Sequence, residues 1–132
     1  MKTYVLDSSA LMTFFENRPG AAKVEELLVK AAGTQRPVAM SVVNWGEVYY
    51  SVWRAHGEKV AYVKLQEIAQ LPIRIVEADL QLTLEAATLK AQYRLPYADA
   101  FAAALVRVSK ASLVTCDRDF ECVKNVINIL WV

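Results

Sequence analysis

The sequence contains little histidine and cysteine, with one His and two Cys among its 132 residues. Cys116 and Cys122 lie six positions apart without a histidine cluster beside them, a pattern that fits neither a zinc site nor a disulfide framework. We expect both to be reduced, structural thiols. His56 is expected in a surface loop, without a role as general base.

A long apolar stretch is also absent. The longest uninterrupted run, Ala100 to Val106, is far shorter than the ~20 residues that cross a bilayer, so no membrane partner is expected. Near the start of the chain, Asp7 interrupts the apolar residues too early for a signal-peptide core of roughly 7–15 residues. These features predict a cytoplasmic protein.

The chain has neither a strong excess of one charge nor a linker. It carries 15 Lys and Arg against 14 Asp and Glu, a net charge of +1, and no basic tail. No internal repeat and no Gly/Ser-rich segment divides it. With 55% hydrophobic and 22% charged residues, we expect residues 1–132 to form a single domain with an adequate core.

Short β-rich runs alternate with longer segments of helical periodicity. This alternation predicts an α/β fold with a central, mainly parallel sheet of about five strands, covered by helices on both faces. The expected strands are Tyr4–Leu6, Val38–Met40, Ile73–Val76, Leu113–Thr115 and Ile127–Trp131. The expected helices cover about 8–17, capped by Ser8 or Ser9, then 22–32 with Gly33 as stop, 42–55, 58–70, 80–93 and 97–110.

Four acidic residues occupy unusual places on this map. Asp7 and Asp117 follow apolar strands, whose carboxyl ends share one edge of a parallel sheet, where ligand sites form. Glu47 and Asp99 lie in helices that are otherwise apolar. Such carboxylates would repel one another unless a divalent cation lay between them, and oxygen ligands suit Mg²⁺ or Mn²⁺.

Each acid also has an ordinary interpretation. Asp7 could cap the first helix, and Asp99 could be a first-turn acid favoured by the helix dipole. Asp117 and Asp119 could shape a polar turn, and Glu47 could face solvent. Their joint occurrence favours a shared metal site over four separate explanations.

Four segments that hold these acids, "YVLDSSALMTFF", "SVVNWGEVYY", "LPYADAFAAALV" and "LVTCDRDF", resemble the motifs of the PIN domain, and in particular of VapC-type toxins of toxin–antitoxin modules. The resemblance implies a PIN-like α/β/α sandwich and a metal-dependent endoribonuclease that cleaves RNA. It also implies a homodimer and a cognate antitoxin protein.

The resemblance assigns catalysis and metal binding to Asp7, Glu47, Asp99 and Asp117, with Asp119 as a secondary ligand. Ser8 and Thr115 would orient the carboxylates or a metal-bound water. The sequence departs from the family pattern before Glu47, where it carries Asn44 and Trp45 in place of smaller residues. We expect this departure to affect the substrate groove.

The remaining charges suit a nucleic-acid partner. Setting the four proposed ligands aside leaves 10 acids against 15 basic residues, a balance compatible with a phosphate backbone. Candidate phosphate contacts, for which solvated surface charge is an equal alternative, are Arg18, Lys90, Arg94 and Arg118. A helical stripe of Trp45, Tyr49 and Trp53 fits core packing, base stacking or a protein interface.

Other functions remain open at this point. A catalytically inactive PIN-like module that binds RNA or protein is the main alternative. A phosphatase with Asp7 as nucleophile would need a second aspartate at position 9, which is Ser9. A receiver domain would need an adjacent acidic pair near the first strand, and the chain has none there.

Overall fold

Five short strands form one sheet in the computed structural model, which describes residues 2–132. Every neighbouring pair is parallel, and the strand order is β3-β2-β1-β4-β5. The prediction of about five mainly parallel strands is confirmed. The strands are β1 (Tyr4–Leu6), β2 (Val38–Ser41), β3 (Ile73–Val76), β4 (Ser112–Thr115) and β5 (Asn128–Trp131).

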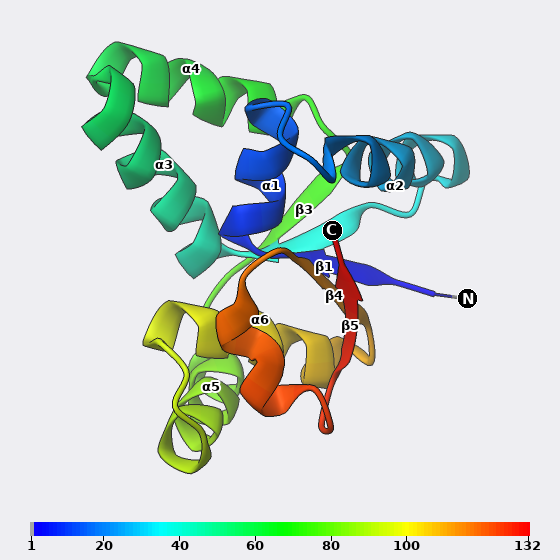
Figure 1. Ribbon diagram of the computed structural model, residues 1–132, viewed down its shortest axis with the longest axis vertical. Coiled ribbons are helices and arrows are strands. Elements are labelled where there is room, and N and C mark those ends of the chain that lie inside the picture. The colour runs from blue at the N-terminus through cyan, green and yellow to red at the C-terminus, as the bar shows by residue number, and fades with distance from the viewer. Residues whose placement is uncertain (1) are drawn as a thin grey trace.

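Helices cover both faces of the sheet, as expected for this alternation. In Figure 1, α1 to α4 lie on one side of the sheet and α5 and α6 on the other. The pairs α3–α4 and α5–α6 are inserted before and after β3. The helices are α1 (Ser8–Phe15), α2 (Ala21–Thr34), α3 (Val42–His56), α4 (Glu58–Ala69), α5 (Leu80–Gln92), α6 (Tyr97–Ser109) and a 3₁₀ helix η1 (Arg118–Val123).

Alternate residues of the central strands point into two separate cores. On β1, Val5 packs with the α5–α6 side, whereas Leu6 packs with the α1–α4 side. Successive side chains of a strand face opposite sides of the sheet. Because both sides are covered by helices, the central strands β1, β2 and β4 are largely apolar and buried, as parallel strands usually are.

Helix α6 is the most deeply buried helix of the fold. Eight consecutive residues, Asp99 to Val106, are buried, and four alanines of this segment are fully inaccessible. Small side chains allow the helix to lie close to its neighbours on all sides. Among residues 2–132, no helix is long and apolar enough to cross a membrane.

Two predicted helix ends are wrong. Asp7 caps α1, as its ordinary interpretation held, and Ser8 or Ser9 does not, since Asp7 Oδ1 accepts the Ala10 N–H at 2.9 Å. Helix α2 continues through Gly33 to Thr34, because Gln35 adopts the left-handed conformation (φ 56°) that ends it. The turn expected after β4 is η1, which Asp117 caps.

The cysteine and histidine predictions can be compared with the structure directly. Cys116 and Cys122 are both free thiols, as expected, although Cys122 is exposed. His56 is exposed but is the last residue of α3 rather than part of a loop.

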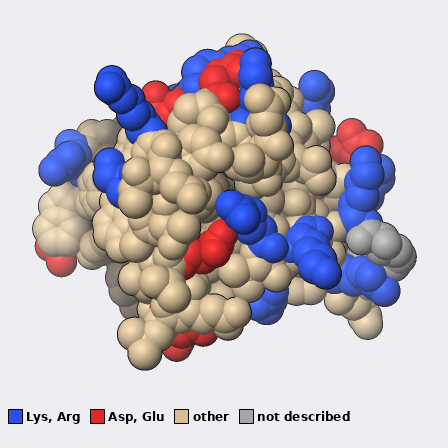
Figure 2. All heavy atoms as spheres, turned by 90° about the horizontal axis from the view of Figure 1, so that it is seen from below, with Lys and Arg blue, Asp and Glu red and all other residues tan. Residues whose placement is uncertain are grey.

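Basic side chains gather at the amino edge of the sheet, where the strands begin. One open hollow of about 440 Å³ is lined by Arg107, Lys110 and Lys124 beside the starts of β4 and β5. A second, of about 270 Å³, is lined by residues that include Lys2, Lys30 and Arg36, beside the starts of β1 and β2. Figure 2 shows lysine and arginine side chains grouped on the right half of the face seen from below.

Candidate functional site

The carboxyl edge of the sheet collects the acids. Asp7 follows β1, and Asp117 comes two residues after the end of β4, the strand beside β1. On the other side of β1, strand β2 leads directly into α3, which carries Glu47. Asp99 lies in the first turn of α6. The sheet order therefore brings acids from four distant segments to one edge.

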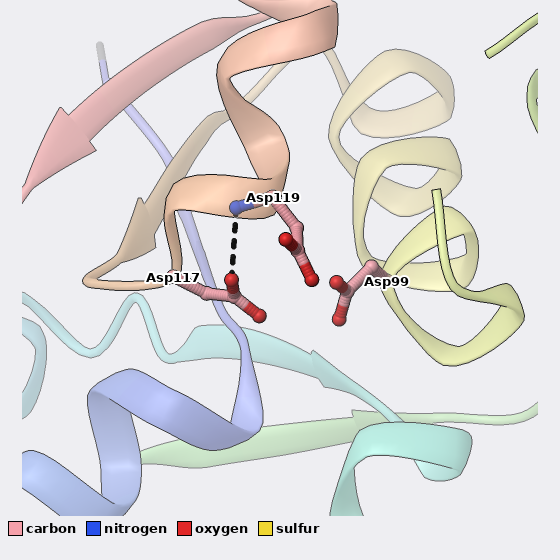
Figure 3. Close-up of side chains that lie close together, drawn as sticks. All are labelled: Asp99, Asp117 and Asp119. Atoms are coloured by element: carbon pink, nitrogen blue, oxygen red, sulfur yellow. Dashed lines mark hydrogen bonds between the residues drawn. The ribbon is translucent and has the colours of Figure 1, made fainter. Parts of the chain in front are cut away.

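Three of the carboxylates lie closest together. Asp99, Asp117 and Asp119 each offer an oxygen, and these oxygens all lie within 4.8 Å of one another. Their side chains point toward a common space in Figure 3. Asp99 is buried, Asp117 is half-buried and Asp119 is exposed, so the group opens to solvent on the η1 side.

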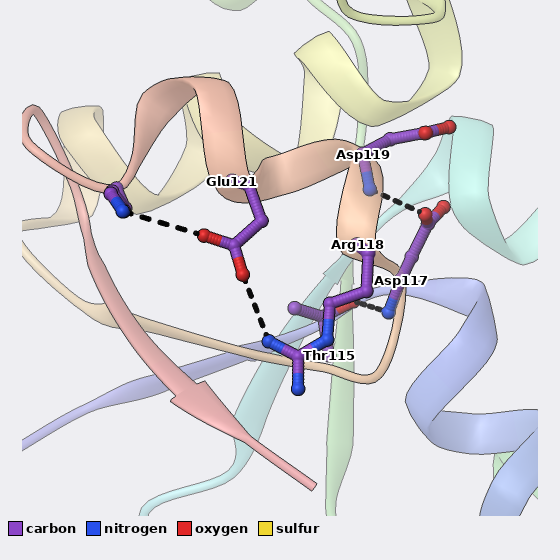
Figure 4. Close-up of polar contacts among 6 residues, drawn as sticks. Thr115, Asp117, Arg118, Asp119 and Glu121 are labelled. Atoms are coloured by element: carbon purple, nitrogen blue, oxygen red, sulfur yellow. Dashed lines mark hydrogen bonds and ion pairs between the residues drawn. The ribbon is translucent and has the colours of Figure 1, made fainter.

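The start of η1 fixes two of these acids. The Asp119 N–H donates to Asp117 Oδ1 at 2.9 Å, and the Asp117 N–H donates to Thr115 Oγ1 at 3.0 Å (Figure 4). The alternative interpretation of Asp117 and Asp119 as a polar turn is thus correct for their backbone. It leaves one Asp117 oxygen and the Asp119 carboxylate free of these bonds.

Asp99 is the acid whose burial is least compensated by hydrogen bonds. Its side chain is only 7% exposed, and Oδ2 has no hydrogen-bond partner within residues 2–132. Burial, followed by the nearby charges of Asp117, Asp7, Glu47 and Asp119, raises its pKa to about 8. A buried, unpartnered oxygen among carboxylates is what a hard divalent cation would satisfy. The residues present therefore fit Mg²⁺ or Mn²⁺.

Asp7 is, by contrast, fully hydrogen-bonded. Oδ1 accepts the Ala10 N–H and the Ser9 hydroxyl, and Oδ2 accepts the Thr115 hydroxyl at 2.5 Å and Ser9 at 2.9 Å. Burial raises the pKa of Asp7 to about 6, while the bonds from Thr115, Ala10 and Ser9 oppose that rise. Asp7 thus caps α1 and also contacts β4 beneath the other acids.

Ser9 is a site residue that the sequence interpretation missed. Its hydroxyl bonds both oxygens of Asp7, lies 3.1 Å from Thr115 Oγ1 and accepts the Cys116 N–H at 3.2 Å. The signal in the sequence was the second serine of "DSS". Ser8, which was expected to orient a carboxylate or a metal-bound water, donates to the Glu47 carboxylate at 3.0 Å.

Glu47 is half-buried rather than solvated. Its Oε1 accepts the Ser8 hydroxyl at 3.0 Å and the Asn44 amide at 2.9 Å. Within residues 2–132, Oε2 accepts no hydrogen bond. Glu47 therefore presents one fixed oxygen and one free oxygen. Asn44 was expected to affect the substrate groove, but it is fully buried and holds Glu47 instead.

The four basic candidates are all exposed. Arg18 lies beyond the end of α1 opposite Asp7 and pairs with Glu16. Arg118 directly follows Asp117, but its guanidinium pairs with Glu121 at 2.9 Å and lies 4.4 Å from the Trp131 ring centre. Lys90 lies in the last turn of α5, and Arg94 lies in the segment that leads to α6. A phosphate-binding role for any of them stays a prediction.

The aromatic stripe on α3 divides into two parts. Trp45 and Tyr49 are half-buried and pack against the α1–α4 core. Trp53 is 43% exposed and meets the Tyr49 ring edge-on, with 5.6 Å between the ring centres. Core packing thus explains the first two residues and leaves the Trp53 ring at the surface.

Solved structures with the same fold come from toxin–antitoxin complexes and toxins. VapBC from Salmonella typhimurium, crystallised with DNA, has a chain with a TM-score of 0.75 at 14% identity, covering 99% of this chain and 98% of that one. VapBC2 from Rickettsia felis, bound to a DNA fragment from its promoter, gives 0.74 at 18% identity, with 98% of each chain covered.

A third structure is VapC20 from Mycobacterium tuberculosis, described as a toxin that cleaves the sarcin–ricin loop. It has a TM-score of 0.71 at 15% identity, with coverage of 95% and 96%. At such identities the likeness shows a common fold. No curated protein matches the chain in sequence.

The sequence itself carries a family signal that spans the elements described above. A model described as "PIN domain" matches residues 4–126, from the start of β1 to the segment before β5. The match includes all five acids of the carboxyl edge. On this evidence the chain belongs to the PIN domain family.

Proposed function

We propose that this protein is an Mg²⁺- or Mn²⁺-dependent endoribonuclease and the toxin of a type II toxin–antitoxin system. The observation that carries the proposal is the buried Asp99 carboxylate, with an unpartnered oxygen, among four further acids. Membership of the PIN family and the fold shared with a toxin that cleaves the sarcin–ricin loop support it.

In this proposal Asp7, Glu47, Asp99 and Asp117 form the catalytic metal site, and Asp119 supplies a further oxygen. When bound, the divalent cation provides the Lewis acidity that activates water and stabilises the leaving oxygen in phosphodiester hydrolysis. The protein's part is to hold the oxygens in place. The supporting hydroxyls that do so are Ser8, Ser9 and Thr115.

The partners belong to the same proposal. RNA is the substrate, a cognate antitoxin protein is the inhibitor, and the protein acts in the cytoplasm as a homodimer of single-domain chains. Related folds crystallised as VapBC complexes support the antitoxin. Arg18, Lys90, Arg94 and Arg118 are the residues to test for phosphate contacts.

RNA cleavage by the purified protein tests the proposal. We expect cleavage of a structured RNA with Mg²⁺ or Mn²⁺, none with EDTA, and at least a hundredfold loss for Asp99→Asn. Asp79→Asn is the matched control, because Asp79 caps α5 through its side chain and asparagine is an equally good cap.

Two results would contradict the proposal. One is cleavage that persists in EDTA, and the other is full activity of Asp99→Asn. If calorimetry detects no binding of Mg²⁺ or Mn²⁺ by the wild-type protein, the alternative of an inactive PIN-like module that binds RNA or protein is favoured.

A further inference from the structure

Asn44 is a fully buried polar residue at the junction of two helices that carry acids. It lies in the first turn of α3, three residues before Glu47, and is 0% exposed. Its Nδ2 donates to Glu47 Oε1 at 2.9 Å and to the backbone oxygen of Ala98 at 3.2 Å. Ala98 precedes Asp99 in the first turn of α6.

The orientation of this carboxamide follows from its partners. A glutamate oxygen and a backbone carbonyl are both acceptors, so the NH₂ group has to face them. One amide group thus uses both of its hydrogens to connect the Glu47 side chain to the backbone beside Asp99. In the described part of the chain, the Asn44–Ala98 bond is the only hydrogen bond that joins α3 to α6.

The same arrangement leaves Asn44 Oδ1 buried without a partner among residues 2–132. An unsatisfied buried acceptor destabilises the folded state, and a leucine of the same branched shape would avoid that penalty. The two donated bonds, which a leucine could not make, offset this penalty. They also have a second effect, because one of them fixes an oxygen of a proposed metal ligand.

The second donor to Glu47 strengthens this interpretation. Ser8 also bonds Oε1, at 3.0 Å, so both donors hold the same oxygen and leave Oε2 without a hydrogen bond from the described residues. A carboxylate that is held by one oxygen has a fixed orientation, and its other oxygen remains available to bind a metal ion. Because the Asn44 amide is neutral, it orients Glu47 without adding a cation that would compete with a metal ion.

We propose that Asn44 is a positioning residue for the metal site: its carboxamide presets the Glu47 carboxylate relative to Asp99 before a divalent cation binds. The proposal rests on the proposed function, since it requires that these acids bind a metal. Groups that orient metal ligands in this way typically affect metal affinity by about 10- to 100-fold when they are lost.

The test compares Mn²⁺ binding by the full-length wild type and Asn44→Leu, using calorimetry and the electron paramagnetic resonance signal of free Mn²⁺. We expect the variant to fold with a lower metal-free unfolding temperature, because two donated hydrogen bonds are lost, and its Mn²⁺ affinity to fall by about 10- to 100-fold. In a background of Glu47→Gln, Asn44→Leu should weaken binding no further, because Asn44 acts through Glu47.

Ser41→Ala is the matched control. Ser41 is equally buried, caps the same helix by accepting the Val43 N–H at 3.2 Å, and among residues 2–132 makes no hydrogen bond to Glu47. Loss of this cap should lower the unfolding temperature and leave Mn²⁺ affinity unchanged. A general loosening of α3 would instead weaken binding in both variants and overturn the proposal.

The outcomes distinguish a failure of the positioning role of Asn44 from a failure of the proposed function. If wild type and Asn44→Leu bind Mn²⁺ equally well, the positioning role is wrong while the proposed function stands. If the wild type binds no Mn²⁺, the proposed function fails and the positioning role with it.

A second measurement on the wild type covers the case in which Asn44→Leu does not fold. The Asn44 side-chain NH₂ protons should exchange with solvent far more slowly than those of the exposed Asn17 and Asn125, with and without Mg²⁺. Exchange as fast as in these exposed asparagines would overturn the proposal.

Discussion

Raising the pH should destabilise the metal-free protein in a range where most proteins change little. The pKa of Asp99 is raised from an ordinary 3.8 to about 8 in the folded state. Between these values the folded protein holds a proton that the unfolded chain has released. The resulting stabilisation is fully present below about pH 3.8 and is lost as the pH rises through 8.

The magnitude follows from one proton. In the middle of that range the free energy of unfolding should fall by ~1.4 kcal/mol per pH unit, or about 2 kcal/mol from pH 6 to pH 7.5. For a domain of this size, such a loss lowers the unfolding temperature by roughly 6–10 °C. Asp7, with a pKa of about 6, adds a similar dependence at lower pH.

Thermal unfolding followed by circular dichroism in EDTA measures this effect. Asp99→Asn should have a much smaller slope and should unfold at a higher temperature than the wild type at pH 8, because it buries no charge. Asp79→Asn should keep the wild-type slope. Saturating Mg²⁺ should remove most of the pH dependence of the wild-type unfolding temperature. A wild-type unfolding temperature that is constant or rises from pH 6 to 7.5 in EDTA would refute the reasoning, as would an unchanged slope in Asp99→Asn.

Two further predictions concern stability measured by urea unfolding at pH 7. Thr115→Val keeps the shape of the side chain but removes its bond to Asp7 Oδ2. It should lower the free energy of unfolding by about 1.5–3 kcal/mol. An effect no larger than that of Ser112→Ala, on the same strand, would contradict this prediction. Gly57→Ala should lower the free energy of unfolding by about 1–3 kcal/mol, because φ 94° and ψ 167° are nearly restricted to glycine. Gly33→Ala should raise the free energy of unfolding by about 0.5–1 kcal/mol, since Gly33 is helical with open space around it. Equal effects of the two glycine substitutions would show that backbone conformation is not the cause.

The fold was accessible from the sequence because its signals are local. The boundaries of β1 follow from a short apolar run that ends at Asp7, and the burial of both sheet faces explains why this run does not alternate with polar residues. The end of α2 was not accessible, because glycine is only one of the residues that adopt a left-handed cap. Gln35 does so here.

The candidate site was accessible only in part. Acids in apolar surroundings are visible in a sequence, since they contrast with their neighbours. The roles of the groups that orient them are not visible, because their contacts join distant positions: Ser9 meets Thr115 across 106 residues, and Asn44 meets Ala98 across 54. The second serine of "DSS" and the unusual Asn44 are visible in the sequence, but their distant partners are not.

The enclosure of α6 has a consequence for how the protein moves. A helix whose residues 99–106 are buried on every side cannot release its backbone amides by local fraying, so their hydrogen exchange should require opening of the whole domain. Asp99 is therefore attached to one of the slowest-exchanging segments of the molecule. Asp119, in contrast, is itself exposed, next to the buried Phe120 in the first turn of η1. The two sides of the acidic group thus differ in exposure: Asp99 is held inside the core, whereas the Asp119 side chain meets solvent.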